Sequence, residues 1–95
     1  MNLRKLAKGH ECLVRLPGCL GHSETVVLCH IRLGGIAGMG QKPPDLCGFY
    51  GCMACHNLVD GRQHMANLTR QEIEQAVLRG LLRTLVLVSQ ELELA

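Results

Sequence analysis

Residues 51–57 read Gly-Cys-Met-Ala-Cys-His-Asn, and this stretch decides how the rest of the chain is interpreted. Two cysteines separated by two residues are a common zinc-binding pattern, because both thiolates can reach one metal from a single turn. A second pair, Cys12 and Cys19, lies upstream. We therefore predict one structural Zn²⁺ site with four thiolate ligands, which folding assembles from Cys12, Cys19, Cys52 and Cys55.

The composition favours a metal-supported core. The chain has 95 residues, and a domain of this size buries only roughly 60–65% of its unfolded surface. Large rings are scarce, because the sequence holds one Phe, one Tyr and no Trp. A structural zinc would contribute on the order of 10 kcal/mol to folding. The six cysteines can instead form disulfides, but the amino terminus lacks the pattern of a signal peptide, so we expect reduced thiols and a cytoplasmic protein.

The charge is unevenly distributed along the chain. The formal net charge is +2; residues 1–70 hold eight Lys or Arg against four acids, and residues 71–95 hold two against four. The part that bears the cysteines is therefore the basic part. This excess is compatible with a nucleic-acid partner, whose phosphate backbone attracts Lys and Arg, and equally with an ordinary solvated surface. No run of about 18 apolar residues occurs, so we expect no membrane partner.

The sequence predicts a small α+β fold in a single domain, with a zinc-bearing ββα module over residues 1–68. Residues 12–19 read as a strand-like segment that ends in a Pro-Gly turn. The first eleven residues fit either a short helical turn or a flexible basic arm. The remaining predicted elements are strands at 25–31 and 47–51, a Gly- and Pro-rich loop at 34–44, and a helix at 53–59 that Gly61 interrupts.

The last third predicts one long helix, residues 69–95, packed on that module. Thr69 and Glu72 match a capping box at its start. Apolar residues recur at helical spacing, and three more widen the stripe: Ile73, Val77, Leu81, Leu85, Val88 and Leu92, with Leu78, Leu82 and Val86. We expect the stripe to cover the rest of the domain, with a dimer interface as the alternative. Residues 85–88 also fit a strand.

Three residues can act together on a phosphodiester. His56 and Asp60 are four apart and share a helix face, where they can hold a divalent cation. His30 ends a predicted strand and can act as a general base toward water. Each also has a structural interpretation, in which His30 is a buried hydrogen-bonded residue, His56 a zinc ligand or packing residue, and Asp60 a turn residue. His64 follows the helix break, so its direction is not predicted.

Strand, His30, Gly-rich loop, second strand, then Cys-x-x-Cys-His at the start of a helix resembles the ββα-metal fold of the HNH endonucleases. More narrowly, the chain is similar to the YbcO type, small candidate nucleases encoded by lambdoid prophages. The segments that carry this likeness are 12–19, 28–31, 38–40, 42–43 and 52–62. The likeness covers nearly the whole chain, and its most specific piece is residues 52–62.

The resemblance implies roles for individual residues. His30 would be the general base that polarises the attacking water. His56 would be a ligand of a catalytic Mg²⁺ or Mn²⁺, with Asp60 or His64 as a second ligand. The four paired cysteines would hold the structural zinc.

Two positions depart from the HNH pattern. Many HNH enzymes have an acid or a second histidine just before the general base, where this chain has Cys29. The middle Asn of the motif has no direct counterpart, and Asp45 is the nearest polar candidate.

The sequence therefore predicts a zinc-stabilised endonuclease that hydrolyses phosphodiester bonds in DNA. The alternative is a non-catalytic zinc-knuckle module that binds DNA or a phage recombination or replication protein. The trio His30, His56 and Asp60 distinguishes the two, because a binding module does not need these residues around one cleft.

Overall fold

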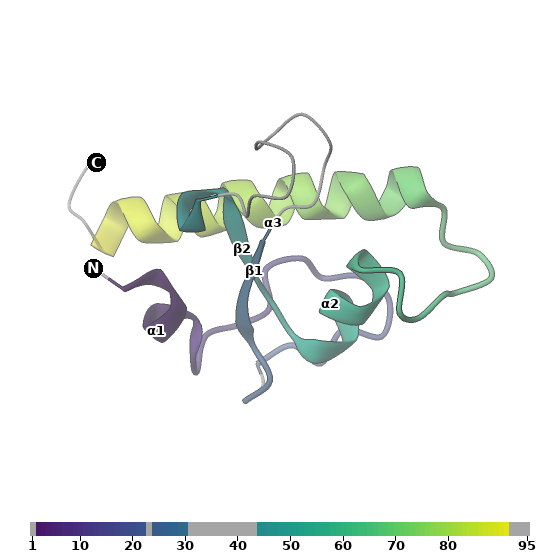
Figure 1. The fold of residues 1–95 in the computed structure, drawn as a ribbon, viewed down its shortest axis with the longest axis horizontal. Coiled ribbons are helices and arrows are strands. Elements are labelled where there is room, and N and C mark those ends of the chain that lie inside the picture. Colours follow the sequence, from purple (N-terminus) through teal and green to yellow (C-terminus); the bar gives the residue numbers. More distant parts are fainter. Residues whose placement is uncertain (1, 23, 31–43, 92–95) are drawn as a thin grey trace.

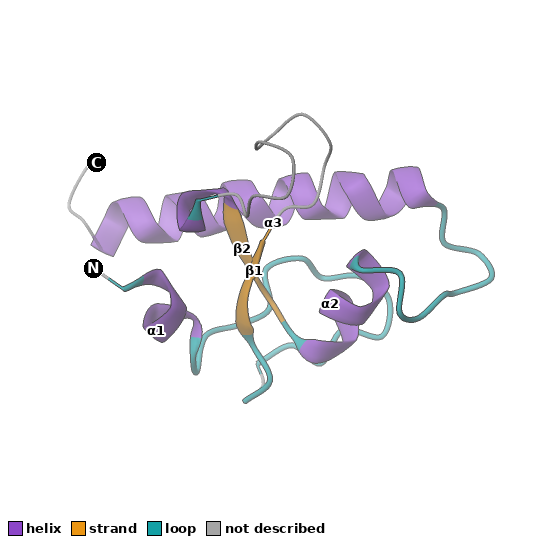
Figure 2. Cartoon of the chain, viewed as in Figure 1, coloured by secondary structure: helices purple, strands orange, loops and turns teal. Residues whose placement is uncertain are grey.

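The computed structural model describes residues 2–22, 24–30 and 44–91. Within these ranges lie α1 (Leu3–Ala7), β1 (Val27–His30), the 3-10 turn η1 (Asp45–Cys47), β2 (Gly48–Gly51), α2 (Met53–Val59) and α3 (Arg70–Glu91). Figure 1 shows α3 along the long axis of the molecule, with both strands crossing it near its middle. Helices and a small sheet share one structure (Figure 2), so the predicted α+β class is confirmed. The predicted loop at 34–44 lies outside the described residues except for its last position.

The sheet consists of β1 and β2, which run antiparallel with His30 opposite Gly48. Both strands are shorter than predicted. β1 begins at Val27 because Thr25 lies in a turn, where its Oγ1 accepts a hydrogen bond from Met53 N at 3.0 Å. This bond joins the approach to β1 to the first residue of α2, so the strand and the helix are fixed to each other.

Position 48 requires glycine because the strands approach closely there. A Cβ atom on Gly48 would lie 2.7 Å from Leu28 Cδ1 and 2.9 Å from the carbonyl oxygen of Cys29. No real Cβ tolerates such distances to backbone. The glycine therefore permits the strand pairing that places His30 at the end of the sheet.

The segment between Cys12 and Cys19 is irregular, so the prediction of a strand there is wrong. Its flank makes only an isolated bridge, between Glu11 and His22. The chain instead turns around the sulfur of Cys12, and Arg15 adopts φ +60° in doing so. The predicted turn after Pro17 is present.

The amino-terminal residues form a helical turn, which resolves the alternative in favour of helix. Asn2 is the N-cap of α1, and its Oδ1 accepts hydrogen bonds from Arg4 N and Lys5 N. Ala7 is fully buried, so α1 is anchored against the core at its end.

Helix α3 begins at the predicted capping box. Thr69 Oγ1 accepts a hydrogen bond from Glu72 N at 3.1 Å, and Glu72 Oε1 accepts one from Thr69 N at 3.2 Å. Residues 85–88 are helical, so the alternative of a strand there is wrong. None of the helices in the described ranges is long and apolar enough to cross a membrane.

The buried face of α3 differs from the predicted stripe. Leu78, Leu82 and Val86 are 55%, 54% and 59% exposed, so the stripe is narrower than predicted. The face that packs inward instead includes two small residues, Gly80 and Thr84. They allow close packing, which a larger residue would prevent.

Gly80 and Thr84 fix the position of α3 on the sheet and the cysteine loop. A Cβ atom on Gly80 would lie 3.1 Å from Val14 Cγ2. Thr84 Oγ1 accepts a hydrogen bond from Tyr50 N at 3.1 Å and donates one to the carbonyl of Gly80 at 2.7 Å. Arg83 Nη1 donates to the carbonyl of Leu13 at 2.8 Å. The helix is thus joined to β2 and to the segment that carries Cys12.

Candidate metal centre and histidine pairs

Four cysteine sulfurs converge on one point. The Sγ atoms of Cys12, Cys19, Cys52 and Cys55 all lie within 4.8 Å of one another, as the sequence predicted. Three of the four residues are buried, and Cys19 is half-buried. All six cysteines of the chain are free thiols, so the disulfide alternative is not realised. The four sulfurs can hold a metal ion.

The positions of the sulfurs suit tetrahedral coordination. Zinc–sulfur bonds of about 2.3 Å place the ligands of a tetrahedral site roughly 3.8 Å apart. Cys52 Sγ and Cys19 Sγ lie 3.9 Å apart. The donor set, four thiols without a carboxylate, is the kind that structural zinc sites use and is compatible with zinc.

Backbone amides stabilise negative charge on these sulfurs. Leu20 N donates to Cys52 Sγ at 3.4 Å, and Gly21 N donates to Cys19 Sγ at 3.3 Å. Cys52 is also the N-cap of α2, where its Sγ accepts a hydrogen bond from Cys55 N at 3.5 Å. The start of α2 and the upstream loop are therefore built around the sulfurs.

The four thiols share their protons unequally. The thiol of Cys55 donates a hydrogen bond to Cys12 and, against the effect of burial, lowers the pKa of Cys12 to about 4. The same contact raises the pKa of Cys55, because its proton is held by the neighbouring thiolate. One ligand is thus already a thiolate at neutral pH, and metal binding must displace the remaining protons, so metal affinity falls as the pH falls.

His30 forms a pair with Asp45. His30 ends β1 and Asp45 begins η1; His30 Nε2 lies 2.8 Å from Asp45 Oδ1. The His30 side chain is 18% exposed, so one part of it still reaches solvent. The hydrogen bond from His30, assisted by Arg4 Nη2 at 3.5 Å, holds the pKa of the Asp45 carboxyl below its usual range. Asp45 is therefore ionised at neutral pH and can orient the imidazole.

His56 and Asp60 form a second pair on α2. The predicted helix at 53–59 is confirmed, and the spacing of four residues places His56 Nε2 3.0 Å from Asp60 Oδ2. The Asp60 side chain is only 8% exposed, and Arg62 Nη2 lies 3.7 Å from the same oxygen. The helix ends at Asp60, and Gly61 follows with φ +78°, a conformation that terminates helices.

Asp60 also acts on the buried thiol next to His30 in the sequence. Burial raises the pKa of the Cys29 thiol to about 12, and the negative charge of Asp60 adds to this shift.

Cys29 itself belongs to the core. It is 2% exposed, and its Sγ lies 3.7 Å from the carbonyl of Val27 and 3.9 Å from that of Gly51. With so high a pKa the thiol remains protonated, which makes it a poor metal ligand. Cys29 is therefore a small buried residue of the core.

His64 is not gathered with His56 and Asp60. It is exposed and lies beyond the end of α2. Within residues 2–22, 24–30 and 44–91, the four cysteines form the only group of three or more potential metal ligands that lie this close together. The contact between His30 and Asp45 was not predicted from the sequence. Its only signal was that Asp45 is the polar residue nearest to the position of the middle Asn in the HNH motif.

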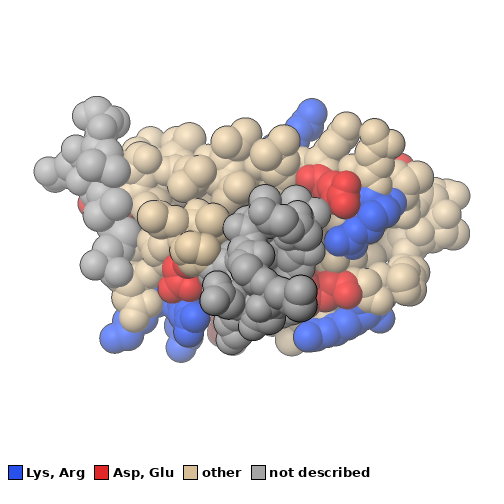
Figure 3. Space-filling view, turned by 45° about the horizontal axis from the view of Figure 1, so that its top comes forward, with Lys and Arg blue, Asp and Glu red and all other residues tan. Residues whose placement is uncertain are grey.

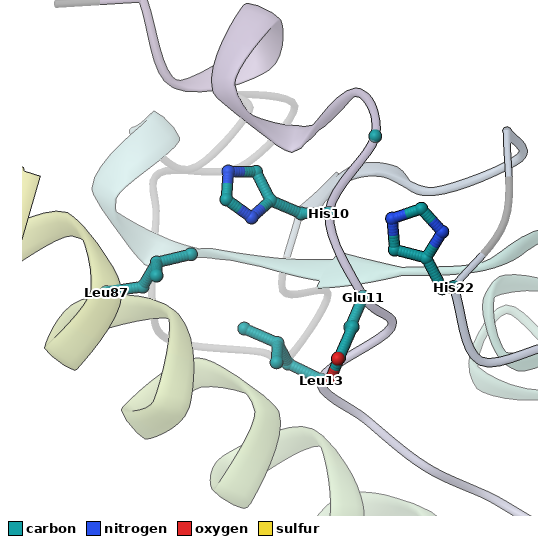
Figure 4. A pocket seen from close by; sticks show the side chains of 6 residues that line it. His10, Glu11, Leu13, His22 and Leu87 are labelled. Carbon is teal, nitrogen blue, oxygen red and sulfur yellow. The ribbon is translucent and has the colours of Figure 1, made fainter.

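A hollow elsewhere on the molecule also contains histidines. It has a volume of about 360 Å³ and is lined by His10, Glu11 and His22 from the amino-terminal segment and by Leu87 from α3 (Figure 4). The His10 ring packs against the Tyr50 ring, with 5.5 Å between their centroids. None of the predicted catalytic residues lines this hollow.

Comparisons with known proteins agree on one family. The sequence profile described as "Putative nuclease YbcO" matches residues 1–92. "Putative nuclease YbcO" of Escherichia coli (strain K12) is 46% identical over 91 residues, which cover 95% of this chain and 93% of that protein. "Putative nuclease ybcO" of Enterobacteria phage 82 is similar to the same extent.

The fold also matches a solved structure. That structure is described as "Structure of a putative bacteriophage protein from Escherichia coli str. K-12 substr. MG1655". The two agree with a TM-score of 0.74 at 40% sequence identity, over 93% of this chain and 96% of the other.

Proposed function

Because the chain belongs to the family described as "Putative nuclease YbcO", we propose that it is an HNH-type endonuclease that hydrolyses phosphodiester bonds in DNA with a divalent cation. The proposal concerns the reaction, the substrate and the roles of the residues. The strand, strand and helix order of β1, β2 and α2 supports the assignment to the HNH type.

The contact between His30 and Asp45 carries this proposal. Hydrolysis needs a base that removes a proton from the attacking water, and a histidine does this best when its other nitrogen is held. If Nε2–H donates to Asp45 Oδ1 across the observed 2.8 Å, Nδ1 of His30 carries the lone pair that accepts the proton. The ionised Asp45 then stabilises the imidazolium that forms.

His56 and Asp60 would hold the catalytic cation. His56 Nε2 and Asp60 Oδ2 lie 3.0 Å apart, so both atoms could turn to one cation in place of their mutual contact. A bound Mg²⁺ or Mn²⁺ would offset the negative charge that develops on the phosphate. Asp60 supplies the anionic ligand, and the position of both residues on one short helix fixes their spacing.

The four cysteines would hold zinc as a structural support. Cys52 and Cys55 occupy the N-cap and first turn of α2, the helix that carries His56. A metal at the sulfurs therefore fixes the start of this helix relative to the sheet. We infer that zinc acts on activity through the position of His56.

His56→Ala tests the cation site. We expect the Mn²⁺ concentration for half-maximal nicking of supercoiled plasmid to rise by at least about tenfold, because one of two protein ligands is lost. His22→Ala, which removes an exposed histidine outside both pairs, should leave the cation dependence unchanged. The same Mn²⁺ dependence in His56→Ala as in the wild type would exclude His56 as a ligand.

A further inference from the structure

Three arginines line a hollow on the surface between the cysteine loop and α3. The hollow has a volume of about 240 Å³. Arg15 lies on its loop side, and Arg79 and Arg83 lie on its helix side, with Glu72 as its acidic residue. These residues belong to neither histidine pair, and three positive charges face one negative charge.

The other arginines in the described part of the chain have acidic partners. Arg4 lies near Asp45, Arg62 near Asp60, and Arg70 Nε is 4.0 Å from Glu74 Oε1. Figure 3 shows the same mixing on one face, where blue and red atoms lie next to one another.

The arginines of the hollow are not neutralised in this way. The ion pairs found between described residues include none of Arg15, Arg79 and Arg83. Glu72 lines the same hollow, but its Oε1 accepts hydrogen bonds from the N and Oγ1 of Thr69. Arg79 and Arg83 are four residues apart on α3, a spacing at which like charges destabilise a helix. An anion bound between the arginines would offset this repulsion.

The side chain of Arg83 is held in place, and Arg15 lies at a left-handed backbone position. Arg83 Nη1 donates to the carbonyl of Leu13 at 2.8 Å, which fixes its guanidinium and uses one of five donors. Arg15 sits at φ +60°, where its N–H and that of Val14 turn toward Cys12. The turn explains the backbone conformation, but it does not explain why the residue is an arginine, because glycine or asparagine adopts this conformation with less strain.

We propose that this arginine hollow, Arg15 with Arg79 and Arg83, binds a phosphate group of the nucleic-acid backbone. Guanidinium groups bind phosphate oxygens through paired hydrogen bonds, and such contacts position a duplex without reading its sequence. This inference rests on the proposed function and deepens it. It assigns a second contact with the substrate, separate from the residues that act on the bond.

The test is binding of a fluorescently labelled DNA duplex, followed by anisotropy over a range of KCl concentrations without divalent cations. Arg15→Gln and Arg79→Gln should each weaken binding roughly tenfold, the loss expected for one charge-assisted hydrogen-bonded contact. The slope of log K against log salt should become shallower by about 1 in each variant. Lys8→Gln removes one charge from an exposed residue outside the hollow, and its effects should be clearly smaller.

Arg15→Gly separates binding from folding. It removes the side chain at a position whose backbone favours glycine, so it should melt at the same or a higher temperature and keep its zinc. Its DNA binding should nonetheless be as weak as that of Arg15→Gln. If Arg15→Gly instead loses zinc or melts at a lower temperature, the arginines offset the charge of the thiolate site and the proposal is wrong.

The remaining outcomes distinguish a failure of the arginine hollow from a failure of the proposed function. If Arg15→Gln and Arg79→Gln bind like Lys8→Gln while the wild type binds and cuts DNA, only the arginine hollow is refuted. If the wild type binds DNA through these arginines but does not cut it, the hollow stands and the hydrolytic function fails. If the wild type neither binds nor cuts, both are overturned.

Discussion

Replacing His30 by alanine should reduce nicking of supercoiled plasmid about 10²- to 10⁴-fold, the usual loss when a general base is removed. His30 is the better base of its pair, because the pKa of the Asp45 carboxyl is held below its usual range and its Oδ1 is engaged by the imidazole. The fold should survive. His30 ends β1 and remains partly exposed, so alanine leaves only a small cavity at the edge of the sheet.

Zinc content and DNA binding distinguish a catalytic loss from a structural one. His30→Ala should carry as much zinc as the wild type and bind a DNA duplex as tightly. Asp45→Asn should also reduce cutting, because its amide carries no charge to stabilise the imidazolium and can donate to His30, which changes the tautomer. Wild-type rates in His30→Ala would show that another group activates the water.

Replacing Cys52 by serine should leave the chain without bound zinc and without stable structure. Loss of a ligand from a four-thiolate site forfeits binding free energy on the order of 10 kcal/mol, which is comparable to the whole stability of a small domain. Cys52 is fully buried, and its sulfur also accepts hydrogen bonds from Leu20 N and Cys55 N. Metal analysis and circular dichroism of the purified variant measure both effects.

Cys47→Ser is the matched control for this substitution. Cys47 is half-buried in η1 and lies outside the group of four sulfurs. The variant should keep about one zinc per chain and a stability close to that of the wild type. A folded Cys52→Ser variant with full zinc content would show that the metal is held elsewhere.

Local patterns were read correctly from the sequence wherever one short segment determines the structure. The four cysteines, the capping box of Thr69 and Glu72, and the pairing of His56 with Asp60 each follow from spacing. The helix at 53–59 also follows, because Cys52 begins it and Gly61 ends it. These features need no knowledge of distant contacts.

Features that depend on contacts between distant segments were not read correctly. Ile73, Val77 and Val88 of the predicted face of α3 are buried, but the small residues Gly80 and Thr84, which also pack inward, were not predicted. Nothing in a hydrophobic pattern marks a small residue as a close contact. The strand predicted at 12–19 failed for a related reason, because the backbone there turns around a sulfur instead of pairing with a strand.

In the candidate site, too, the contacts between distant segments were harder to predict than the local patterns. The pairing of His30 with Asp45 joins positions separated by a segment outside the described residues, and spacing could suggest it only weakly. The arginine hollow joins the loop of Cys12 to α3 and had no signal in the sequence beyond a basic composition.

The proposed function requires that this chain hydrolyses DNA with a divalent cation. The most direct measurement is the conversion of supercoiled plasmid to nicked circles by folded, zinc-loaded wild-type protein, followed over time with and without Mg²⁺ or Mn²⁺. We predict that nicked circles accumulate only when the cation is present, at a rate proportional to the protein concentration. Plasmid that stays supercoiled with every divalent cation would contradict the proposed function. The alternative function, a zinc-knuckle module that binds without cutting, would then replace it.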